Sequence, residues 1–559
     1  METKTQKFLK FLPRLILWLS LALLCYGSFL FDKLPNFRDL TTLEFYYNLN
    51  SSSFDLGYVQ RLIWNSITSL HILNPPILGT VFWAGSFYLG LILTRVFLPK
   101  VTHLLFSKTL PSSYSLLLSL IYVFNPWILE RVLMGQYNVI RGHFLMLPVL
   151  YFAGLSFQEY KHKNYFLFCF WLVILSIVST HHLIFLGIAL LFYLIINKSK
   201  LLNWLRVLTP LIIATLARSL RYTNDSEFQY YNQTIAKNPA KLLEIVSSFS
   251  LKSSEKGNLI VEALNGLASW NTPTFQEYTN WKKDLGSAQN FLLIFNPNLQ
   301  IIYVVSLVII LGIFLFRTKT NLALKIWLTG LSTGSLFLNF GLSNSYLAAV
   351  NKYFYSLPFS YSLREPGKFY SLFILSFVLI LGSLVSRSRL WITVLLMFVS
   401  LNFTLSFLGI NEYYQQVEFG SFYTRASQIC QGQKTLSLPF DTYYTPSYSN
   451  DIYNVNTLSL QLNCQIIPID NISVAGNSKD KIEYLSQSNF GNQVENLTTN
   501  ICDKTKGSLK FLEVNKIKYL LLDTRYYPDL NQNIDCFKNS LDLKLQEGSL
   551  YLLEVSKKN

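Results

Sequence analysis

The sequence predicts a polytopic α-helical membrane protein with about 11 transmembrane helices and a C-terminal domain outside the membrane. Of its 559 residues, 51% are hydrophobic and only 14% are charged, whereas a typical soluble domain has about 25% charged residues. Several apolar runs are long enough to cross a hydrocarbon core of about 30 Å. The last part of the chain is polar and large enough to form a core of its own.

Eleven apolar runs define the predicted spans. They cover about residues 12–31, 76–97, 113–128, 141–157, 164–180, 182–197, 204–220, 299–316, 325–341, 369–386 and 390–409. The first run has no clear small-residue cleavage site after it, and many more spans follow. We therefore interpret it as a retained signal anchor that leaves the N-terminus in the cytoplasm.

The net charge of +16 is concentrated in the apolar part of the chain. Residues 1–410 carry 33 basic and 15 acidic residues, and residues 411–559 carry 14 and 16. With the N-terminus inside, the predicted cytoplasmic segments contain 17 basic residues and only two acidic ones, Glu2 and Glu159, as the positive-inside rule requires. The charge therefore indicates membrane topology, and we exclude DNA and RNA as partners.

The predicted topology is that of a multi-pass protein of the cell membrane with most of its non-membrane chain outside. The external segments of the membrane domain 1–410 are about 32–75, 129–140, 221–298 and 342–368. An odd number of spans also places the C-terminal domain, 411–559, on the external side. Because the cytoplasmic loops are short, we expect the functional site on the external face.

The C-terminal domain is predicted to be α/β or α+β. Apolar runs typical of strands cover residues 435–439, 465–469, 517–522 and 550–555, and residues 479–487 are predicted to form a helix. The domain contains four cysteines, Cys430, Cys464, Cys502 and Cys536, an even number that allows two disulfides in an external compartment. Their spacing matches no zinc pattern, so no cofactor is assigned, although a divalent metal is not ruled out.

Charged residues in the first two external segments are candidates for chemistry. Asp39 follows the first span by a few residues and can face the helix bundle from the membrane surface, or it can be an ordinary solvated loop acid. Glu130 and Arg131 follow Asn125-Pro126, where Pro126 is expected to end the third span or to begin a short interfacial helix. Charges at that depth are costly unless they are paired or functional. The alternative is an ion pair of Glu130 with Arg131 or Arg141 that only fixes the loop.

Two further segments carry polar groups of the right type for a substrate. His181 and His182 fall at the predicted external turn between the fifth and sixth spans, where they can bind a substrate hydroxyl or metal, or be polar turn residues. In the segment Arg364-Glu365-Pro366-Gly367-Lys368, Arg364 can contact a phosphate with two hydrogen bonds and Lys368 adds a compact positive charge. We count Glu365 with these substrate-binding residues. The alternative is non-specific contact with lipid phosphates.

Several function classes have no support in the sequence. It contains no P-loop, no GxSxG, no HExxH and no dinucleotide-binding fingerprint. The spans have almost no charged residues at their centres and show no internal repeat, in contrast to ion-coupled transporters.

The order of these motifs resembles a known superfamily. An Asp soon after the first span, the segment from Asn125 to Gly135, a long tryptophan-containing external loop and the segment from Arg364 to Phe369 occur in sequence. In this order the chain resembles GT-C glycosyltransferases, in particular the arabinofuranosyltransferase-like and YfhO-like group. It departs from many relatives after the seventh span, where Ala217 to Tyr222 replace an aromatic-rich turn.

The resemblance implies a GT-C-like fold with its active site on the external face. It implies inverting transfer of a sugar from a polyprenyl-phosphate-linked donor to an envelope glycan, lipid or protein, with membrane lipids as surroundings. Asp39 would be the catalytic base, Arg364 and Lys368 would face the donor phosphate, and Glu130 and Arg131 would be paired charges. The alternative is a non-catalytic protein of lipid-linked glycan transport or envelope assembly.

Overall fold

The computed structural model describes the chain in two compact units, one helical and one mixed. The described residues are 75–133, 136–158, 161–222, 297–343, 345–356, 365–385, 421–438, 489–501, 506–524 and 528–555. Residue 363 and shorter stretches within 242–266, 395–400 and 443–486 are described as well. The first predicted span, the first external loop and the predicted domain boundary at 410–411 lie outside the described residues.

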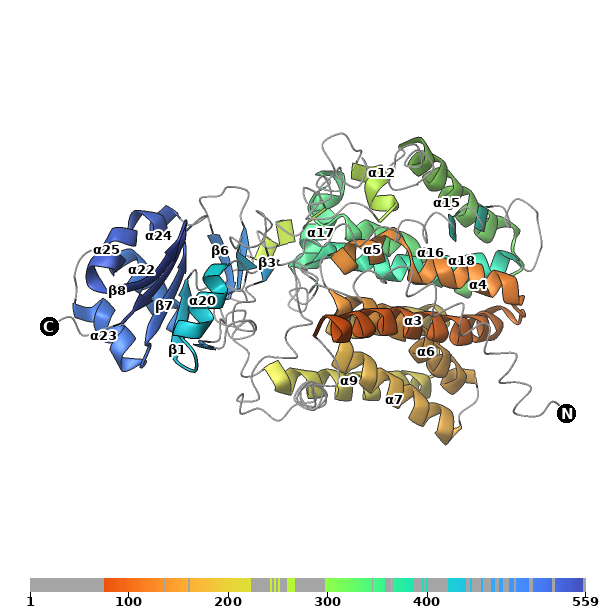
Figure 1. Ribbon diagram of the computed structural model, residues 1–559. Coiled ribbons are helices and arrows are strands. Elements are labelled where there is room, and N and C mark those ends of the chain that lie inside the picture. The colour runs from red at the N-terminus through yellow and green to blue at the C-terminus, as the bar shows by residue number, and fades with distance from the viewer. Residues whose placement is uncertain are drawn as a thin grey trace. The chain divides into compact units, whose positions relative to one another are not determined.

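The helical unit is a bundle of long apolar helices (Figure 1). Its longer helices are α3 (Pro75–Phe106), α4 (Ser112–Val123), α6 (Tyr137–Gln158), α7 (His162–Val178), α8 (Thr180–Ile196), α9 (Leu201–Tyr222), α15 (Pro297–Arg317), α16 (Leu322–Asn339) and α18 (Tyr370–Val385). Shorter elements are α5 (Pro126–Leu133), α12 (Leu259–Leu264), α17 (Ser345–Tyr355) and the 3-10 turn η6 (Pro366–Phe369). The nine predicted spans between residues 76 and 386 coincide with these helices, with a break in the span 113–128.

The length and composition of the helices fit a membrane protein. Within the described ranges, four helices can cross a membrane: Gly85–Phe106, Asn138–Gln158, Asn298–Arg317 and Pro366–Val385. The pair α4 and α5 is a further candidate, bent by 44°. The apolar window of α15 is only 28% buried, and a helix with so much exposed apolar surface needs an apolar surrounding such as lipid.

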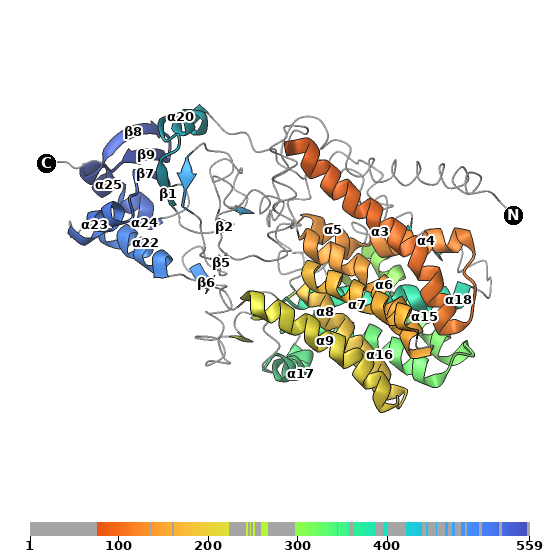
Figure 2. The same ribbon diagram turned by 90° about the horizontal axis from the view of Figure 1, so that it is seen from below.

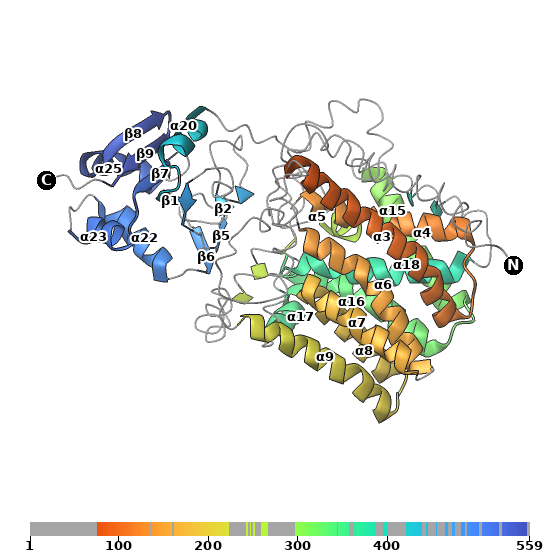
Figure 3. The ribbon, with the colours of Figure 1, turned by 60° about the horizontal axis from the view of Figure 1, so that its bottom comes forward.

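Helix α18 forms the centre of the bundle. Its neighbours are α4, α15 and α16, and the apolar window that contains it is 100% buried. The helix is apolar on all sides, as expected for a helix without a solvent face. Helices α6, α7 and α8 lie side by side in Figures 2 and 3. Helix α16 contacts both α8 and α18.

The Asn125-Pro126 pair causes the break between α4 and α5. The side-chain oxygen of Asn125 accepts a hydrogen bond from the backbone N–H of Ile128 at 3.1 Å, and its amide donates to the carbonyl of Tyr122 at 2.9 Å. Asn125 is thus the N-cap of α5, and Pro126 takes the first helical position, where a missing N–H costs nothing. Of the two alternatives expected for Pro126, the structure shows the start of a short helix.

The second unit is built on a five-stranded mixed sheet in the order β4-β1-β7-β9-β8. The strands are β1 (Lys434–Leu438), β4 (Gln465–Ile466), β7 (Tyr519–Asp523), β8 (Asp542–Glu547) and β9 (Leu550–Glu554). Strand β1 is parallel to β4 and β7, whereas β9 is antiparallel to β7 and β8. The helices are α20 (Ser421–Ile429), α22 (Asn489–Asn500), α23 (Lys506–Val514), α24 (Pro528–Gln532) and α25 (Ile534–Ser540).

Four predicted strands are confirmed, but the helix predicted at residues 479–487 is wrong. Residues Ile482–Ser486 form strand β6, which pairs antiparallel with β5 (Ile472–Ala475). The alternation of Ile482 and Tyr484 with polar Glu483 favours a strand, and this outweighs the helical tendency of the charged residues before it. A second short pair joins β2 (Tyr443–Tyr444) and β3 (Asn454–Val455).

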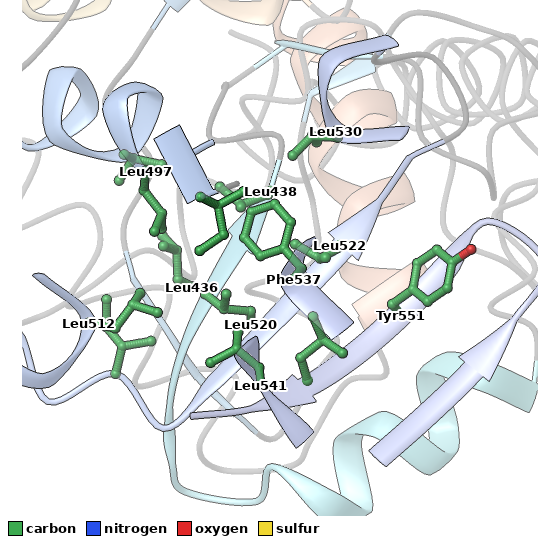
Figure 4. Packing of buried hydrophobic residues seen from close by; sticks show 14 of the residues in the cluster. Leu436, Leu438, Leu497, Leu512, Leu520, Leu522, Leu530, Phe537, Leu541 and Tyr551 are labelled. Carbon is green, nitrogen blue, oxygen red and sulfur yellow. The ribbon is translucent and has the colours of Figure 1, made fainter. Parts of the chain in front are cut away.

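Strand β7 is buried along its whole length because helices cover both faces of the sheet. Leu520 and Leu522 lie in the cluster formed with α22, α23 and α25 (Figure 4). Tyr519 and Leu521 lie in the opposite cluster, which includes residues of α20. Successive side chains of a strand point to opposite faces, so the apolar run of β7 supplies both layers of core.

Replacing Leu520 by alanine is expected to weaken the second unit strongly. Leu520 is fully buried, and a buried Leu→Ala change costs about 2–5 kcal/mol because a cavity remains. Hydrogen exchange of the β1 and β7 amides in the intact protein measures the loss. The control is Leu543→Ala on β8, where the side chain is 45% exposed. An equal loss of protection in both variants would contradict this assignment of the core.

A disulfide joins α20 to the edge of the sheet. Cys430 follows α20 and Cys464 precedes β4, with their Cα atoms 5.2 Å apart. Cys536 is also disulfide-bonded, and Cys502 lies outside the described residues. The expected use of these cysteines in disulfides is thus confirmed for Cys430, Cys464 and Cys536.

Glu554 gives the second unit a predictable pH dependence. Its carboxylate accepts hydrogen bonds from the ammonium groups of Lys518 at 2.5 Å and Lys544 at 2.7 Å, and these lower the pKa of Glu554. A lowered pKa in the folded state stabilises the fold above the unfolded-state pKa of about 4.3, and the effect disappears as the pH falls through the folded-state value.

We therefore expect Glu554→Gln to lower hydrogen-exchange protection of β9 a few-fold at pH 7, and we expect the difference from the wild type to shrink as the pH falls below about 4. The comparison is made between the two proteins at each pH, so intrinsic exchange rates cancel. A difference that does not shrink at acid pH would show that the carboxylate charge is not its cause.

Candidate functional site

Charged side chains from three parts of the sequence meet at the ends of the central helices. Glu130 and Arg131 come from α5, and His181 comes from the first turn of α8. Lys368 lies in the 3-10 turn η6 directly before α18, and Glu365 is the N-cap of that turn. The four charged residues are each less than a tenth exposed. Buried charges in a largely apolar bundle are costly unless they are paired, so this cluster is the first candidate for a functional site.

The charged groups form a continuous chain of contacts. The Lys368 ammonium lies 2.7 Å from Oε1 of Glu365, and it donates a hydrogen bond to Nε2 of His181 at 3.2 Å. The other carboxylate oxygen of Glu365 is 3.6 Å from Nη1 of Arg131. Nη2 of Arg131 is 3.4 Å from Oε2 of Glu130. We call Glu130, Arg131, Glu365, Lys368 and His181 the charged cluster.

Neighbouring residues fix the guanidinium of Arg131 in one orientation. Gln136 accepts a hydrogen bond from Nη1 of Arg131 at 2.8 Å and donates one to Glu365 at 3.4 Å. The guanidinium carbon lies 5.6 Å from the centre of the Trp127 ring, within the range of a cation–π contact. The Trp127 N–H in turn donates to the carbonyl of Gly367 at 2.7 Å.

Gly367 leaves room for a close approach of the Arg131 guanidinium. A Cβ atom on residue 367 would lie 2.8 Å from Nη2 of Arg131, closer than real Cβ contacts occur. The Pro366-Gly367 turn therefore lets α5 approach the start of α18. This contact places Arg131 beside Glu365, although the two are far apart in the sequence.

The charged cluster contains two carboxylates and two permanent cations, so these four charges balance. An anion that binds to Lys368 must take the place of the Glu365 carboxylate or share the ammonium with it. Arg364, the second cation of the predicted phosphate-binding segment, lies outside the described residues. So does Asp39, the predicted catalytic base.

The prediction that both histidines lie in a turn is wrong. The chain between α7 and α8 turns at Ser179, whose backbone is extended (φ −153°, ψ 109°), and α8 begins at Thr180. His181 and His182 therefore lie in the first helical turn and point in different directions. His181 is partly exposed and contacts Lys368, whereas His182 is fully buried.

Six of the eight predicted site residues lie in or beside one cluster, namely Glu130, Arg131, His181, His182, Glu365 and Lys368. Of the two interpretations of Glu130, the ion pair with Arg131 is present, whereas Arg141 instead donates to the Ser86 hydroxyl at 2.9 Å. Sequence reasoning missed Gln136, which bridges α5 and η6. Its only sequence signal is its place in the same polar segment as Arg131.

Metal binding has no candidate in the part of the chain that the structure describes. No group of three or more His, Cys, Asp or Glu side chains lies close enough there to hold a metal ion.

The fold and the charged cluster define a polytopic helical membrane protein that carries a separate α/β unit. This chain is similar in fold to arabinofuranosyltransferase AftD from Mycobacteria, in a cryo-EM structure of a mutant of that protein, with a TM-score of 0.54 and 12% sequence identity. The comparison covers 98% of this chain and 42% of the AftD chain, so this chain spans less than half of AftD. No protein family and no curated protein matches the sequence.

Proposed function

We propose that this protein is a GT-C-like glycosyltransferase that moves a sugar from a polyprenyl-phosphate-linked donor to a cell-envelope acceptor on the external face of the membrane. The observation that carries the proposal is the charged cluster, with Arg131 and Lys368 held at the ends of central helices. The fold shared with an arabinofuranosyltransferase and the order of motifs in the sequence support the same function.

The proposed reaction needs one carboxylate as a base and two cations that face the donor phosphate. The Asp39 carboxylate takes the proton of the acceptor hydroxyl while the acceptor oxygen bonds to the anomeric carbon of the sugar. The bond from that carbon to the phosphate oxygen breaks, and polyprenyl phosphate leaves with the electron pair. Lys368 and Arg364 stabilise the growing negative charge on the phosphate.

Arg131 has a supporting role in this proposal. It already contacts Glu365 and Glu130, so it can hold the Glu365 carboxylate when phosphate occupies the ammonium of Lys368. Both carboxylates then share the guanidinium of Arg131. The phosphate adds negative charge to a cluster whose four charges already balance, and in this proposal Arg364 supplies the compensating cation.

The experiment incubates purified wild-type protein and Asp39→Asn with a pool of polyprenyl-phosphate sugars and follows the lipids by mass spectrometry. We expect the wild type to consume one donor and release polyprenyl phosphate. Loss of a general base lowers the rate by about 10²- to 10⁴-fold, so Asp39→Asn should show almost no turnover. Donor binding without turnover, equal in both proteins, would instead favour lipid-linked glycan transport or assembly.

A further inference from the structure

A row of buried polar side chains lies next to the charged cluster in the helix bundle. It consists of Ser179, His182, Ser371 and His143, and it ends at the backbone carbonyl of Tyr122. The two histidines and Ser371 have no exposed surface, and Ser179 is 4% exposed. These groups are therefore shielded from substrate, and sequence motifs did not point to Ser371.

Only one assignment of donors and acceptors along this row makes all four hydrogen bonds while both histidine rings stay neutral. The Tyr122 carbonyl can only accept, so Nε2 of His143 donates to it at 3.2 Å. Nδ1 of a neutral His143 then accepts from the Ser371 hydroxyl at 2.7 Å. Ser371 in turn accepts from Nε2 of His182 at 3.0 Å, and Nδ1 of His182 accepts from Ser179 at 2.8 Å.

Both imidazoles are neutral with the proton on Nε2 in this arrangement. The reverse direction would need an extra proton on His143, because its Nε2 must still donate to the carbonyl. Because His143 is fully buried, a cation there would cost much more than the neutral chain. Tyr122 closes the end of the row by donating its hydroxyl to the His143 carbonyl at 2.6 Å.

The row ties together the same helix ends that carry the charged cluster. Ser371 lies three residues after Lys368, on the first turn of α18, and His182 lies next to His181 on α8. Trp127 packs edge-on against both His143 and His182 while its N–H holds the Gly367 carbonyl. A shift of Ser371 relative to His182 would therefore change the distance between Lys368 and His181.

Gly142 shows how closely the helices are fitted here. A Cβ atom on residue 142 would lie 2.5 Å from Nδ1 of His182 and 2.5 Å from Cβ of Ser179. The absence of a side chain lets α6 come against the turn between α7 and α8. Substitution of Gly142 by alanine therefore pushes on the row without removing any of its hydrogen-bonding groups.

We infer that His143, Ser371 and His182 are positioning residues that set the place of Lys368 relative to His181 for binding and departure of the donor phosphate. The inference rests on the proposed function for its effect on catalysis. The hydrogen-bonded row itself can be tested without any activity. None of these three residues touches substrate.

The first test uses the full-length protein in nanodiscs with ¹⁵N-labelled histidine. The chain has only 6 histidines, so His143→Gln and His182→Gln assign their ring signals. We expect both rings to be neutral with protonated Nε2. Ser371→Ala should move the signals of both rings, whereas Ser376→Ala should not. Ser376 is a matched control because it is a buried serine of α18 that bonds to Ser332 at 2.7 Å. A charged ring, or rings that do not respond to Ser371→Ala, would overturn the inference.

The second test compares the same variants in donor turnover. A misplaced reacting group can cost about 10²-fold in rate, so Ser371→Ala and Gly142→Ala should lower kcat about 10- to 100-fold with the acceptor KM little changed. Ser376→Ala should stay near the wild type. Equal turnover of Ser371→Ala and Ser376→Ala would contradict the positioning role while leaving the proposed function intact.

If the wild type transfers no sugar, the proposed function fails and binding of polyprenyl phosphate replaces turnover in the second test. The positioning role then predicts weaker binding to Ser371→Ala than to Ser376→Ala. Equal binding by the two variants, or no binding to the wild type, would overturn it.

Discussion

Lys368→Met is expected to lower sugar transfer by about 10²- to 10³-fold, the effect of losing one group that stabilises charge in the transition state. In the proposed reaction the ammonium of Lys368 receives the donor phosphate as its bond to the sugar breaks. The measurement is the rate of polyprenyl phosphate release by purified protein. The control is Lys108→Met, because Lys108 bonds to the carbonyl of Ser383 at the other end of α18 at 2.9 Å.

A single change at Lys368 also leaves Glu365 without its nearest cation, so loss of activity must be separated from loss of folding. The double variant Glu365→Gln/Lys368→Met removes one charge of each sign and keeps the cluster balanced. We expect it to fold and remain inactive. Activity near the wild-type rate in the double variant would show that the ammonium has no part in the reaction.

Arg131→Lys is expected to lower transfer by at least tenfold, although the charge is kept. Nη1 of the guanidinium reaches Gln136 and Glu365 while Nη2 reaches Glu130, and a single ammonium cannot make these contacts in the same geometry. Because some hydrogen-bonding partners of a buried guanidinium are then left unsatisfied, the thermal unfolding midpoint should fall too.

Arg206→Lys is the matched control for this variant. Arg206 is a partly buried arginine on α9 whose Nη1 donates to Asn203 at 3.3 Å, away from the charged cluster. Equal activity in Arg131→Lys and wild-type protein would mean that Arg131 acts only as a positive charge.

The long helices of the bundle were predictable because each contains an apolar run of sufficient length, whereas the short helices α12 and α17 lie in segments that were predicted only as external loops. The start of α5 was predictable for a local reason, since Asn125 caps the helix and Pro126 fits its first position. The strands β1, β7 and β9 likewise follow from short apolar runs. The helix prediction at residues 479–487 was wrong because Ile482 and Tyr484 alternate with the polar Glu483, a pattern that favours the observed strand β6.

The arrangement of the site depends on contacts that no local pattern encodes. Residue types and membrane depth pointed to Glu130, Arg131 and Lys368, because charges there need a partner or a function. Their actual partners come from packing of helices far apart in the sequence, as with Gln136 and Glu365. The different burial of His181 and His182 could not be predicted, because adjacent residues of a helix point in different directions and the face of α8 that packs inward is set by distant helices.

The most direct test of the central claim is photo-crosslinking of a polyprenyl-phosphate sugar analogue to the full-length protein in nanodiscs, with the attached peptides identified by mass spectrometry. We expect attachment within residues 126–136 and 363–371, suppressed by excess polyprenyl phosphate and absent in Glu365→Gln/Lys368→Met. Attachment only elsewhere, for example around the cavity of about 160 Å³ lined by Leu104, Tyr193 and Trp327, would contradict the assignment of the charged cluster as the donor site.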